Sequence, residues 1–488
     1  MRKVLFLSVM LGLSFNSFAK SVKYSAPHFD KQEYWLPEVN EDAIIKRIKT
    51  SEKKRKPANS MMVDESMMSS ELKSIEKRIH AIKTSEEYST LFAELNEKYD
   101  TYPKDVQFYI AQVLPMKAFR GIFYRVRPLF ERNSKFIHSN ALTFVKSLSA
   151  KANIYLPYEH VDAAYQFVSS PYYTSKDSLV GTFSSEQEVQ TFVAKEIIPL
   201  IRLSAQRLEK LDLTEPVVWD QRILYGKDTF QDGINRFKLI GELEKNIALS
   251  AVYGTLSQLS TVMAYNLSNT LKMYKDVGVL FGFDGFGLFN TIDGVSAEKV
   301  SRVIRKSEYQ QTGTLLEGGK EWMMFAYQAS QKSVKRMNLA WEQSSTERKE
   351  EGLYMANTGF FNVSREKVNE NINIINRVVF SSGVETLRSA VTGEMIQLNY
   401  SELYKNPPMD LKAFLPTRFE KESKVSRKVS SGVGMGQTLT YRNYSEGTAT
   451  SYNLQTFKSY VPSIKTQDDV YRSIRVLSHI QGNWLTLR

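Results

Sequence analysis

The sequence predicts a mainly α-helical protein, an elongated helical bundle or irregular helical array that ends in a small β-containing C-terminal region. Apolar residues recur at spacings of three and four over most of residues 71–392, which is typical of helices that bury one face. From Met395 onward, Pro407, Pro408 and Pro416 interrupt such patterns, and a stretch of alternating residues follows. No repeat with a period of roughly 30 to 45 residues is present, so a regular tandem-repeat array is not expected.

Residues 1–19 have the composition of a secretory signal peptide. Arg2 and Lys3 precede an apolar run over residues 4–13, and small residues lead up to Ala19. The run is much shorter than the ~20 residues that cross a bilayer as a helix. We therefore expect cleavage after Ala19 and export to the periplasm or out of the cell. The chain contains no cysteine, which excludes a disulfide framework and a lipid anchor on a cysteine.

A basic, poorly ordered N-terminal arm is expected over residues 20–69. This segment lacks sustained periodicity and includes a run of lysines and arginines at positions 46–56. The run is interpreted either as a solvated linker or as a binding arm for an anionic surface. The whole chain is also basic, with a formal net charge of +12. Such a charge favours anionic partners, although merely soluble proteins carry it too.

An N-terminal helical domain is expected over residues 70–215. Its first helix is expected from Glu71, with leucine and isoleucine side chains on one face. Thr84, with Glu87 three residues later, forms a capping box that begins the second helix. Further helices are expected over residues 103–132, 139–151, 157–168 and 184–210. Pro199 should kink the last of these, because proline removes a backbone hydrogen bond.

A central helical domain is expected over residues 216–394. Its strongest helix prediction covers residues 229–277, where apolar side chains recur on one side with few breaks. A stretch rich in glycine and phenylalanine, residues 277–289, follows this helix. Further helices are expected over residues 296–307, 320–351 and 364–392.

The C-terminal region, residues 395–488, is expected to mix strands and helices. Residues 437–457 alternate like a β-hairpin that turns near Glu446 and Gly447. A last helix is expected over residues 467–481, with Thr466 as its N-cap. This region therefore supplies the small β component of the predicted fold.

No motif in the chain places catalytic or metal-binding side chains together. The histidines are isolated, whereas zinc sites usually need two of them one helical turn apart. Three Ser-x-x-Lys matches, at Ser70, Ser296 and Ser364, look like helix N-caps and lack the partner motifs of serine acyl transferases. We therefore expect no metal, cofactor or nucleotide and, on balance, no enzymatic activity. A glycan hydrolase stays open as an alternative, because it needs only two carboxylates that the fold brings together.

Two basic clusters are candidate sites for an anionic partner. The first interleaves arginines with aromatic residues and comprises Arg120, Arg125, Arg127 and Arg132. The second lies on one predicted helix and comprises Lys299, Arg302 and Arg305. Guanidinium groups bind phosphate and carboxylate through two parallel hydrogen bonds, so lipid head groups, lipopolysaccharide or a wall polymer would suit these clusters. In the alternative interpretation the rings lie in the core and the arginines in water.

The glycine-spaced stretch over residues 277–289 is a candidate membrane or interface loop. It carries four aromatic rings, those of Phe281, Phe283, Phe286 and Phe289. It is too short to span a bilayer, but its rings would fit a shallow membrane contact beside basic residues. In the preferred alternative the rings pack between domains, because an exposed patch of this size promotes aggregation.

The sequence as a whole indicates an exported bacterial cell-envelope protein that binds or scaffolds without catalysing a reaction. The expected partner is an anionic envelope component or another envelope protein. Two alternatives stay open, a membrane-active protein that docks through residues 277–289 and a cell-wall glycan hydrolase with a dispersed carboxylate pair. After the signal peptide, no segment is expected to span a membrane.

Overall fold

The fold is described from a computed structural model of the chain. It describes residues 25–29, 36, 46, 63–131, 166–173, 179–225, 236–280, 297–343, 365–389, 392–417, 423–430, 439–446 and 451–485. Over these residues the protein is mainly α-helical, with three two-stranded antiparallel sheets, which confirms the predicted fold class.

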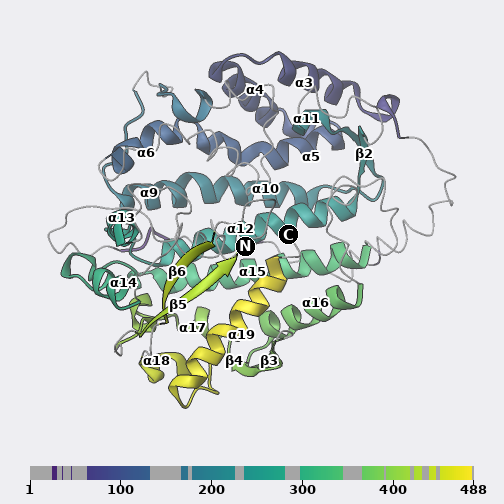
Figure 1. Cartoon of the computed structure of the whole chain (residues 1–488). Helices are drawn as coiled ribbons and strands as arrows, with labels where there is room; N and C mark the ends of the chain where they lie inside the picture. The colour runs from purple at the N-terminus through teal and green to yellow at the C-terminus, as the bar shows by residue number, and fades with distance from the viewer. Residues whose placement is uncertain are drawn as a thin grey trace.

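The long helices lie in successive layers that the chain visits in order (Figure 1). The layers are formed by α3 (Ser70–Ala81) with α4 (Ser85–Glu97), α5 (Lys104–Val113) with α6 (Ile122–Glu131), α9 (Glu186–Phe192) with α10 (Ile198–Lys210), then α12 (Glu242–Ala264), α15 (Gly319–Gln343) and α16 (Arg365–Phe380). Helix α5 packs on α10, α10 on α12, α12 on α15, and α15 on α16. One apolar core extends from α3 to α15, so the layers form a continuous irregular array.

Short elements join the layers or extend them. These are the 3₁₀ segments η1 (Glu65–Met67), η2 (Tyr99–Thr101), η3 (Leu114–Phe119), η6 (Ser307–Tyr309) and η7 (Leu411–Phe414), and the helices α11 (Arg222–Tyr225), α13 (Thr270–Leu280), α14 (Ala297–Ile304), α17 (Glu402–Lys405), α18 (Leu454–Lys458) and α19 (Gln467–Leu485). Helices α13 and α14 pack against each other at one side of the array (Figure 1).

Two helices begin at the polar caps that the sequence predicts. At the start of α4, the Thr84 hydroxyl accepts from the N–H of Glu87, and the Glu87 carboxylate accepts from the N–H of Thr84, which confirms the capping box. At the start of α19, the Thr466 hydroxyl accepts from the N–H of Asp469 at 3.3 Å. Each cap pairs backbone N–H groups that have no partner inside the helix.

The helix predicted over residues 103–132 is broken. Helix α5 ends at Val113, the 3₁₀ segment η3 follows, and α6 begins after Gly121. Gly121 has a φ of 63°, and a Cβ at this position would lie 2.8 Å from the Tyr172 ring, so only glycine fits the turn. The helix predicted over residues 139–151 lies outside the described residues, as does most of the one predicted over 157–168.

The helix predicted over residues 184–210 is distorted just before Pro199. A π-helical turn, η5 (Val193–Ile197), separates α9 from α10. Proline has no N–H to donate and its ring crowds the preceding turn, so the backbone widens at this point. The distortion occurs within one turn of the proline, where the sequence predicts it.

The prediction of one helix over residues 229–277 is wrong in its extent. Phe237–Ile240 form the strand β2, which pairs with β1 (Val217–Asp220), and α12 begins only at Glu242. Helix α12 ends at Ala264, before a buried turn in which Asn269 has a φ of 63°. The side-chain amide of Gln190 caps this end by donating to the carbonyl oxygens of Val262, Met263 and Tyr265. Contacts with distant segments therefore interrupt a locally helical pattern.

Helices α12 and α15 form the most extensive helix pair in the described part of the chain. They run antiparallel, and two serines hold them together. The Ser250 hydroxyl donates to the carbonyl of Ser333 at 2.9 Å, and the Ser333 hydroxyl donates to the carbonyl of Ser250 at 2.8 Å. At the other end of the pair, a Cβ on Gly319 would lie 2.5 Å from the carbonyl oxygen of Ala264. Small side chains thus let the two backbones approach closely.

A buried polar network links α10, α12 and α15. The guanidinium of Arg336 donates to Oε1 of Glu209 at 3.1 Å and to the side-chain carbonyl of Asn246 at 2.8 Å. The Tyr253 hydroxyl donates to the same carboxylate at 2.9 Å. Arg336 is almost fully buried, so its charge is neutralised by Glu209 inside the core.

By length and composition, α12 is the one described helix that is apolar enough to cross a membrane. Its flanks pack against α10 and α15 within the helical array. Its first turns also contain the buried ion pair between Glu242 and Lys245, whose atoms lie 2.6 Å apart. In this structure the helix therefore belongs to the protein core.

Helix α16 ends at Phe380, so the helix prediction over residues 364–392 is wrong after this position. The next residues form the strand β3 (Glu385–Arg388), which pairs with β4 (Met395–Leu398). One face of this hairpin, with Leu387 and Ile396, packs on a second apolar core that also contains side chains of α19. The segment after α16 thus joins the C-terminal region in space.

Strands β5 (Ser423–Ser430) and β6 (Leu439–Glu446) pair antiparallel, which confirms a β-hairpin in the C-terminal region. The predicted turn at Glu446 and Gly447 is wrong, because residues 439–446 pair with the strand before them, and residues 454–457 of the expected second strand lie in helix α18. Alternating residues predict a strand but do not show which segment it pairs with. The sequence pattern was therefore compatible with pairing to the preceding segment or to the following one.

Part of the predicted N-terminal arm is attached to the core. The N–H of Ala26 donates to the carbonyl of Glu317 at 2.8 Å. The Phe29 ring packs edge-on against Trp322, with ring centroids 5.1 Å apart. This segment therefore lies at the start of α15, while the basic run of the arm lies almost entirely outside the described residues.

Candidate binding surface

Arg120, in the first predicted basic cluster, contacts protein groups around the start of α6. Its guanidinium lies over the ring of Tyr172, 4.7 Å from the ring centroid. The same group donates to the Ser89 hydroxyl at 2.9 Å and lies 3.7 Å from the Glu86 carboxylate. A cation over an aromatic face is attracted by the ring, so Arg120 joins α4 to the segment that carries Tyr172.

Arg125, on α6, is enclosed by two aromatic rings. Its guanidinium lies 4.1 Å from the ring centroid of Phe183 and 4.5 Å from that of Phe192. It also donates to the carbonyl of Gly181 at 3.3 Å. Burial lowers the pKa of Arg125, which still stays protonated because an arginine loses its proton only far above neutral pH.

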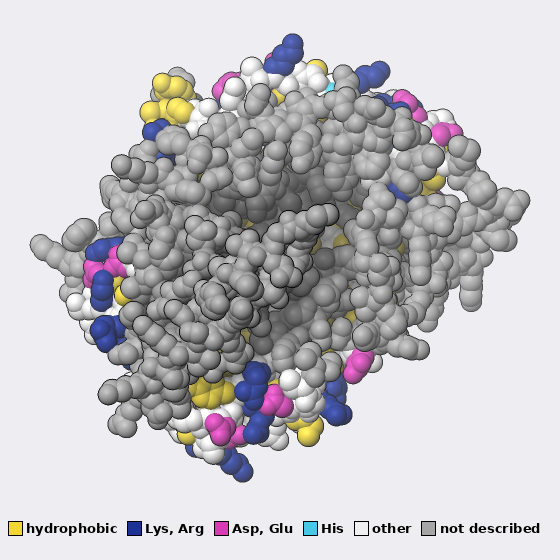
Figure 2. All heavy atoms as spheres, in the orientation of Figure 1, with side chains coloured by type: hydrophobic (Ala, Val, Ile, Leu, Met, Phe, Trp, Pro, Cys, Tyr) yellow, Lys and Arg dark blue, Asp and Glu magenta, His cyan; other side chains and the backbone are white. Residues whose placement is uncertain are grey.

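Both arginines hold a short hairpin against α6. Its two described sides, residues 171–173 and 179–183, meet where the N–H of Val180 donates to the carbonyl of Tyr172 at 3.0 Å, and Tyr173 and Leu179 form an isolated antiparallel bridge. The side chains of this bridge point outward, and Tyr173 is 67% and Leu179 49% exposed. Figure 2 shows a group of hydrophobic side chains with a basic side chain beside it at the upper left margin of the molecule, the side on which Figure 1 labels α6.

We define the hairpin surface as Tyr173 and Leu179 together with Arg120, Arg125 and Arg127. Arg127 is exposed on α6, whereas Arg120 and Arg125 are half-buried. Arg132, the fourth arginine of the predicted cluster, lies outside the described residues. Arg120 and Arg125 thus contact residues next to the exposed aromatic and aliphatic pair and fix its position, while Arg127 is exposed on the same helix as Arg125.

The second predicted basic cluster lies on and after α14. Arg302 is exposed there, and Arg305 donates to the backbone carbonyls of Leu415 and Pro416 at 3.2 Å and 3.1 Å. Lys299 is also on α14, but its side chain is outside the description. In Figure 1, α14 and α6 lie at different levels of the array, so the two clusters form separate surfaces.

The four phenylalanines Phe281, Phe283, Phe286 and Phe289 lie outside the described residues, so their membrane or interface role stays a prediction. The helices that flank them are tied to each other. Lys306 lies 2.9 Å from the Asp276 carboxylate, and the Tyr309 hydroxyl donates to the same carboxylate at 2.8 Å. These contacts join the chain segment before that stretch to the segment after it.

A further charged cluster lies where β1 and β2 meet α3. The fully buried carboxylate of Asp220 accepts from Arg222 and from Arg236, the latter at 2.6 Å. Arg222 also lies 3.2 Å from Glu76, which in turn is 3.5 Å from His80. The charges in this cluster pair with one another, which indicates a structural role. Among the described residues, no group of histidine, aspartate or glutamate side chains could hold a metal ion.

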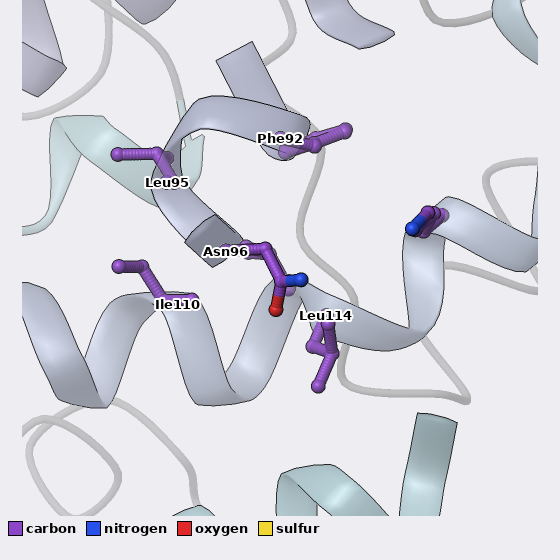
Figure 3. A pocket seen from close by; sticks show the side chains of 7 residues that line it. Phe92, Leu95, Asn96, Ile110 and Leu114 are labelled. Atoms are coloured by element: carbon purple, nitrogen blue, oxygen red, sulfur yellow. The ribbon is translucent and has the colours of Figure 1, made fainter. Parts of the chain in front are cut away.

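A small cavity lies between α4 and α5 (Figure 3). Phe92, Leu95, Ile110 and Leu114 form its apolar walls, and the Asn96 side chain extends between the two helices. Its volume is about 10 Å³, which is close to the minimum for one water molecule. This cavity is therefore a packing space and too small for a substrate.

The exposed pair Tyr173 and Leu179 was not identified from the sequence. Pro171, followed by two tyrosines and a polar run, is typical of a turn and could have indicated an exposed loop with aromatic residues. The contacts of Arg120 and Arg125 could not be predicted, because their aromatic partners lie some 50 residues later in the chain. Comparison with known proteins identifies no family, since no family model, curated protein or solved structure matches the chain.

Proposed function

We propose that the protein is an exported component of a bacterial cell envelope that binds or scaffolds a partner protein through the hairpin surface. The observation that carries this proposal is the exposed pair Tyr173 and Leu179, held in place by Arg120 and Arg125. Tyrosine and arginine are enriched among the residues that dominate binding energy at protein interfaces. Anchoring of the neighbouring residues Tyr172 and Gly181 reduces the backbone freedom that binding would remove, which favours affinity.

The partner is proposed to present acidic residues around an apolar patch. Arg127 is exposed on α6, the helix that carries Arg125, and the chain as a whole carries a formal net charge of +12. Complementary charge speeds association and selects among partners more than it adds affinity. Binding should therefore weaken as the salt concentration rises, mainly through slower association.

Export is part of the proposal and rests on the composition of residues 1–19. Arg2, Lys3 and the apolar run that follows have the order of a signal peptide. N-terminal sequencing of the protein from a periplasmic fraction should give Lys20 as the first residue. A full-length chain found in the cytoplasmic fraction would contradict export.

The binding role is tested by photo-crosslinking in intact cells. A photo-reactive amino acid at position 173 should capture a defined partner, and the same amino acid at Met409, which is 68% exposed elsewhere, should not. The double variant Tyr173→Ser with Leu179→Ser should bind the captured partner at least about tenfold more weakly with unchanged thermal stability, since both side chains are exposed. Equal crosslinking from both positions, or full affinity of the double variant, would overturn the proposal.

A further inference from the structure

Strand β3 has one edge that no described residue covers. The opposite edge of its hairpin is closed, because the N–H of Gln397 on β4 donates to the Ser463 hydroxyl and that of Asn399 donates to the carbonyl of Tyr460. Gln397 therefore points its backbone N–H and C=O groups away from β3. Its cross-strand partner Thr386 points the same groups away from β4, toward the free edge.

The same alternation applies to Arg388, which faces Met395 across the hairpin. The N–H and C=O groups of Thr386 and Arg388 thus point to the free side of β3, and within the described part of the chain they have no hydrogen-bond partner. Figure 1 places β3 at the lower margin of the molecule. A strand edge with unpaired backbone groups is a template for another strand.

The β3–β4 hairpin has buried side chains on one face and exposed apolar side chains on the other. Leu387 and Ile396 are buried beneath the hairpin, which anchors it to the C-terminal core. On the open face, Val384 is 46% and Met395 58% exposed, and neither a proline nor a bulge interrupts the pairing of β3. A strand added here would cover Val384 and form backbone hydrogen bonds, whereas Met395 lies on β4, one strand further from the free edge.

Arg388 gives the open face a positive charge. Its side chain is exposed and makes no ion pair or hydrogen bond within the part of the chain that the structure describes. The nearby carboxylate of Glu394 is already paired with Arg475 at 2.6 Å. An acidic side chain on an added strand would therefore find an uncompensated cation.

We propose that the free edge of β3 binds an extended segment of a partner protein as a third strand, which presents an apolar and an acidic side chain four residues apart on the open face. The backbone groups of Thr386 and Arg388 form the hydrogen bonds. Val384 contacts the apolar side chain and Arg388 pairs with the acidic one, because both residues lie on that face. This surface lies in the C-terminal region and is distinct from the hairpin surface.

The probe for this proposal is a fluorescently labelled seven-residue threonine peptide with glutamate at its second and valine at its sixth position, which share one face of a strand and meet Arg388 and Val384 in an antiparallel pairing. Added to the whole protein, it should raise the fluorescence anisotropy and slow hydrogen exchange at the amides of Thr386 and Arg388. The variant Thr386→Pro removes an outward N–H without touching the bonds to β4, and it should bind at least about tenfold more weakly. The control Thr386→Val keeps the N–H and should bind like the wild type.

Charge selection is tested by Arg388→Glu. This variant should prefer the same peptide with lysine in place of glutamate, reversing the order of affinities found for the wild type. The proposal is overturned if the valine and glutamate peptide protects neither amide, if Thr386→Pro binds it normally, or if sedimentation shows that the edge is already occupied by a second copy of the chain. The hairpin-surface variant Tyr173→Ser should still bind the peptide, which separates this proposal from the proposed function.

Discussion

Glu186 is a carboxyl group that the fold keeps away from water. It begins α9 and is fully buried close to the first residues of α13. Burial raises the pKa of Glu186 to about 9, against the opposing effect of the nearby N–H groups of Thr270 and Leu271. At neutral pH the side chain is therefore protonated in the folded protein and ionised in the unfolded chain.

This proton makes stability depend on pH. Because the pKa rises on folding, from 4.5 to about 9, the contribution of Glu186 is complete below pH 4.5 and is lost as the pH rises toward 9. In the middle of this range, the free energy of unfolding should fall by about 1.4 kcal/mol per pH unit. Glu186→Gln should flatten this slope in urea denaturation between roughly pH 5 and pH 9, whereas the exposed Glu196→Gln should keep it. An unchanged slope in Glu186→Gln would show that another group is responsible.

At the scale of elements, the antiparallel pair α12 and α15 depends on close backbone approach. A methyl group at Gly319 would lie 2.5 Å from the carbonyl oxygen of Ala264 and 2.9 Å from Leu315. Since a backbone carbonyl cannot move aside cheaply, Gly319→Ala should lower the free energy of unfolding by about 2 to 3 kcal/mol. Gly383→Ala is the matched control, because its new methyl group meets nothing within 4 Å. Equal stability of the two variants in chemical denaturation would contradict the close packing.

The polar network that joins these two helices to α10 gives a second prediction. Arg336→Met leaves the Glu209 carboxylate without its cation, so the variant should lose about 3 kcal/mol of unfolding free energy. The additional change Glu209→Gln removes the unpaired charge and should restore part of that loss. Urea denaturation of the two single variants and the double variant tests this coupling, and strictly additive effects would show that the two side chains do not interact.

At the scale of the whole molecule, the N-terminal segment is joined to the middle of the array. Phe29 packs on Trp322 and also on Phe325, with ring centroids 5.6 Å apart in the second case. Phe29→Ala should therefore cost about 2 kcal/mol of unfolding free energy, less than for a fully buried ring. His28→Ala changes an exposed neighbour and should be neutral within ~0.5 kcal/mol. Both values come from thermal or urea denaturation, and a neutral Phe29→Ala would mean that the segment is not docked in solution.

Local signals in the sequence predicted local structure. The caps at Thr84 and Thr466 and the distortion before Pro199 each depend on a few neighbouring residues, and all three are present. Strand β2 was missed, since Phe237–Ile240 continue a helical spacing and become a strand only by pairing with β1. The fold class was therefore predictable from periodicity, while strand partners and interruptions required contacts between distant segments.

The candidate surface was likewise predictable from the sequence only in part. The sequence identified Arg120 and Arg125 because arginines and rings alternate around them, but their partners Tyr172 and Phe183 come from a later segment. Exposure of Tyr173 is likewise set by the whole fold, as no local pattern distinguishes an exposed ring from a buried one. The basic residues were thus found from sequence, while the apolar pair between them required the structure.

The docking of residues 25–29 also constrains the order in which the protein folds. The hydrogen bond between Ala26 and Glu317 joins positions almost three hundred residues apart, so the segment synthesised first must wait for one made much later. Closing so long a loop lowers the chain entropy, and the few contacts formed early in folding do not offset this cost. This contact should form after the folding transition state. Phe29→Ala is then expected to speed unfolding and leave the folding rate nearly unchanged. The docked N-terminal segment would thus slow unfolding of the whole protein without having helped it to fold.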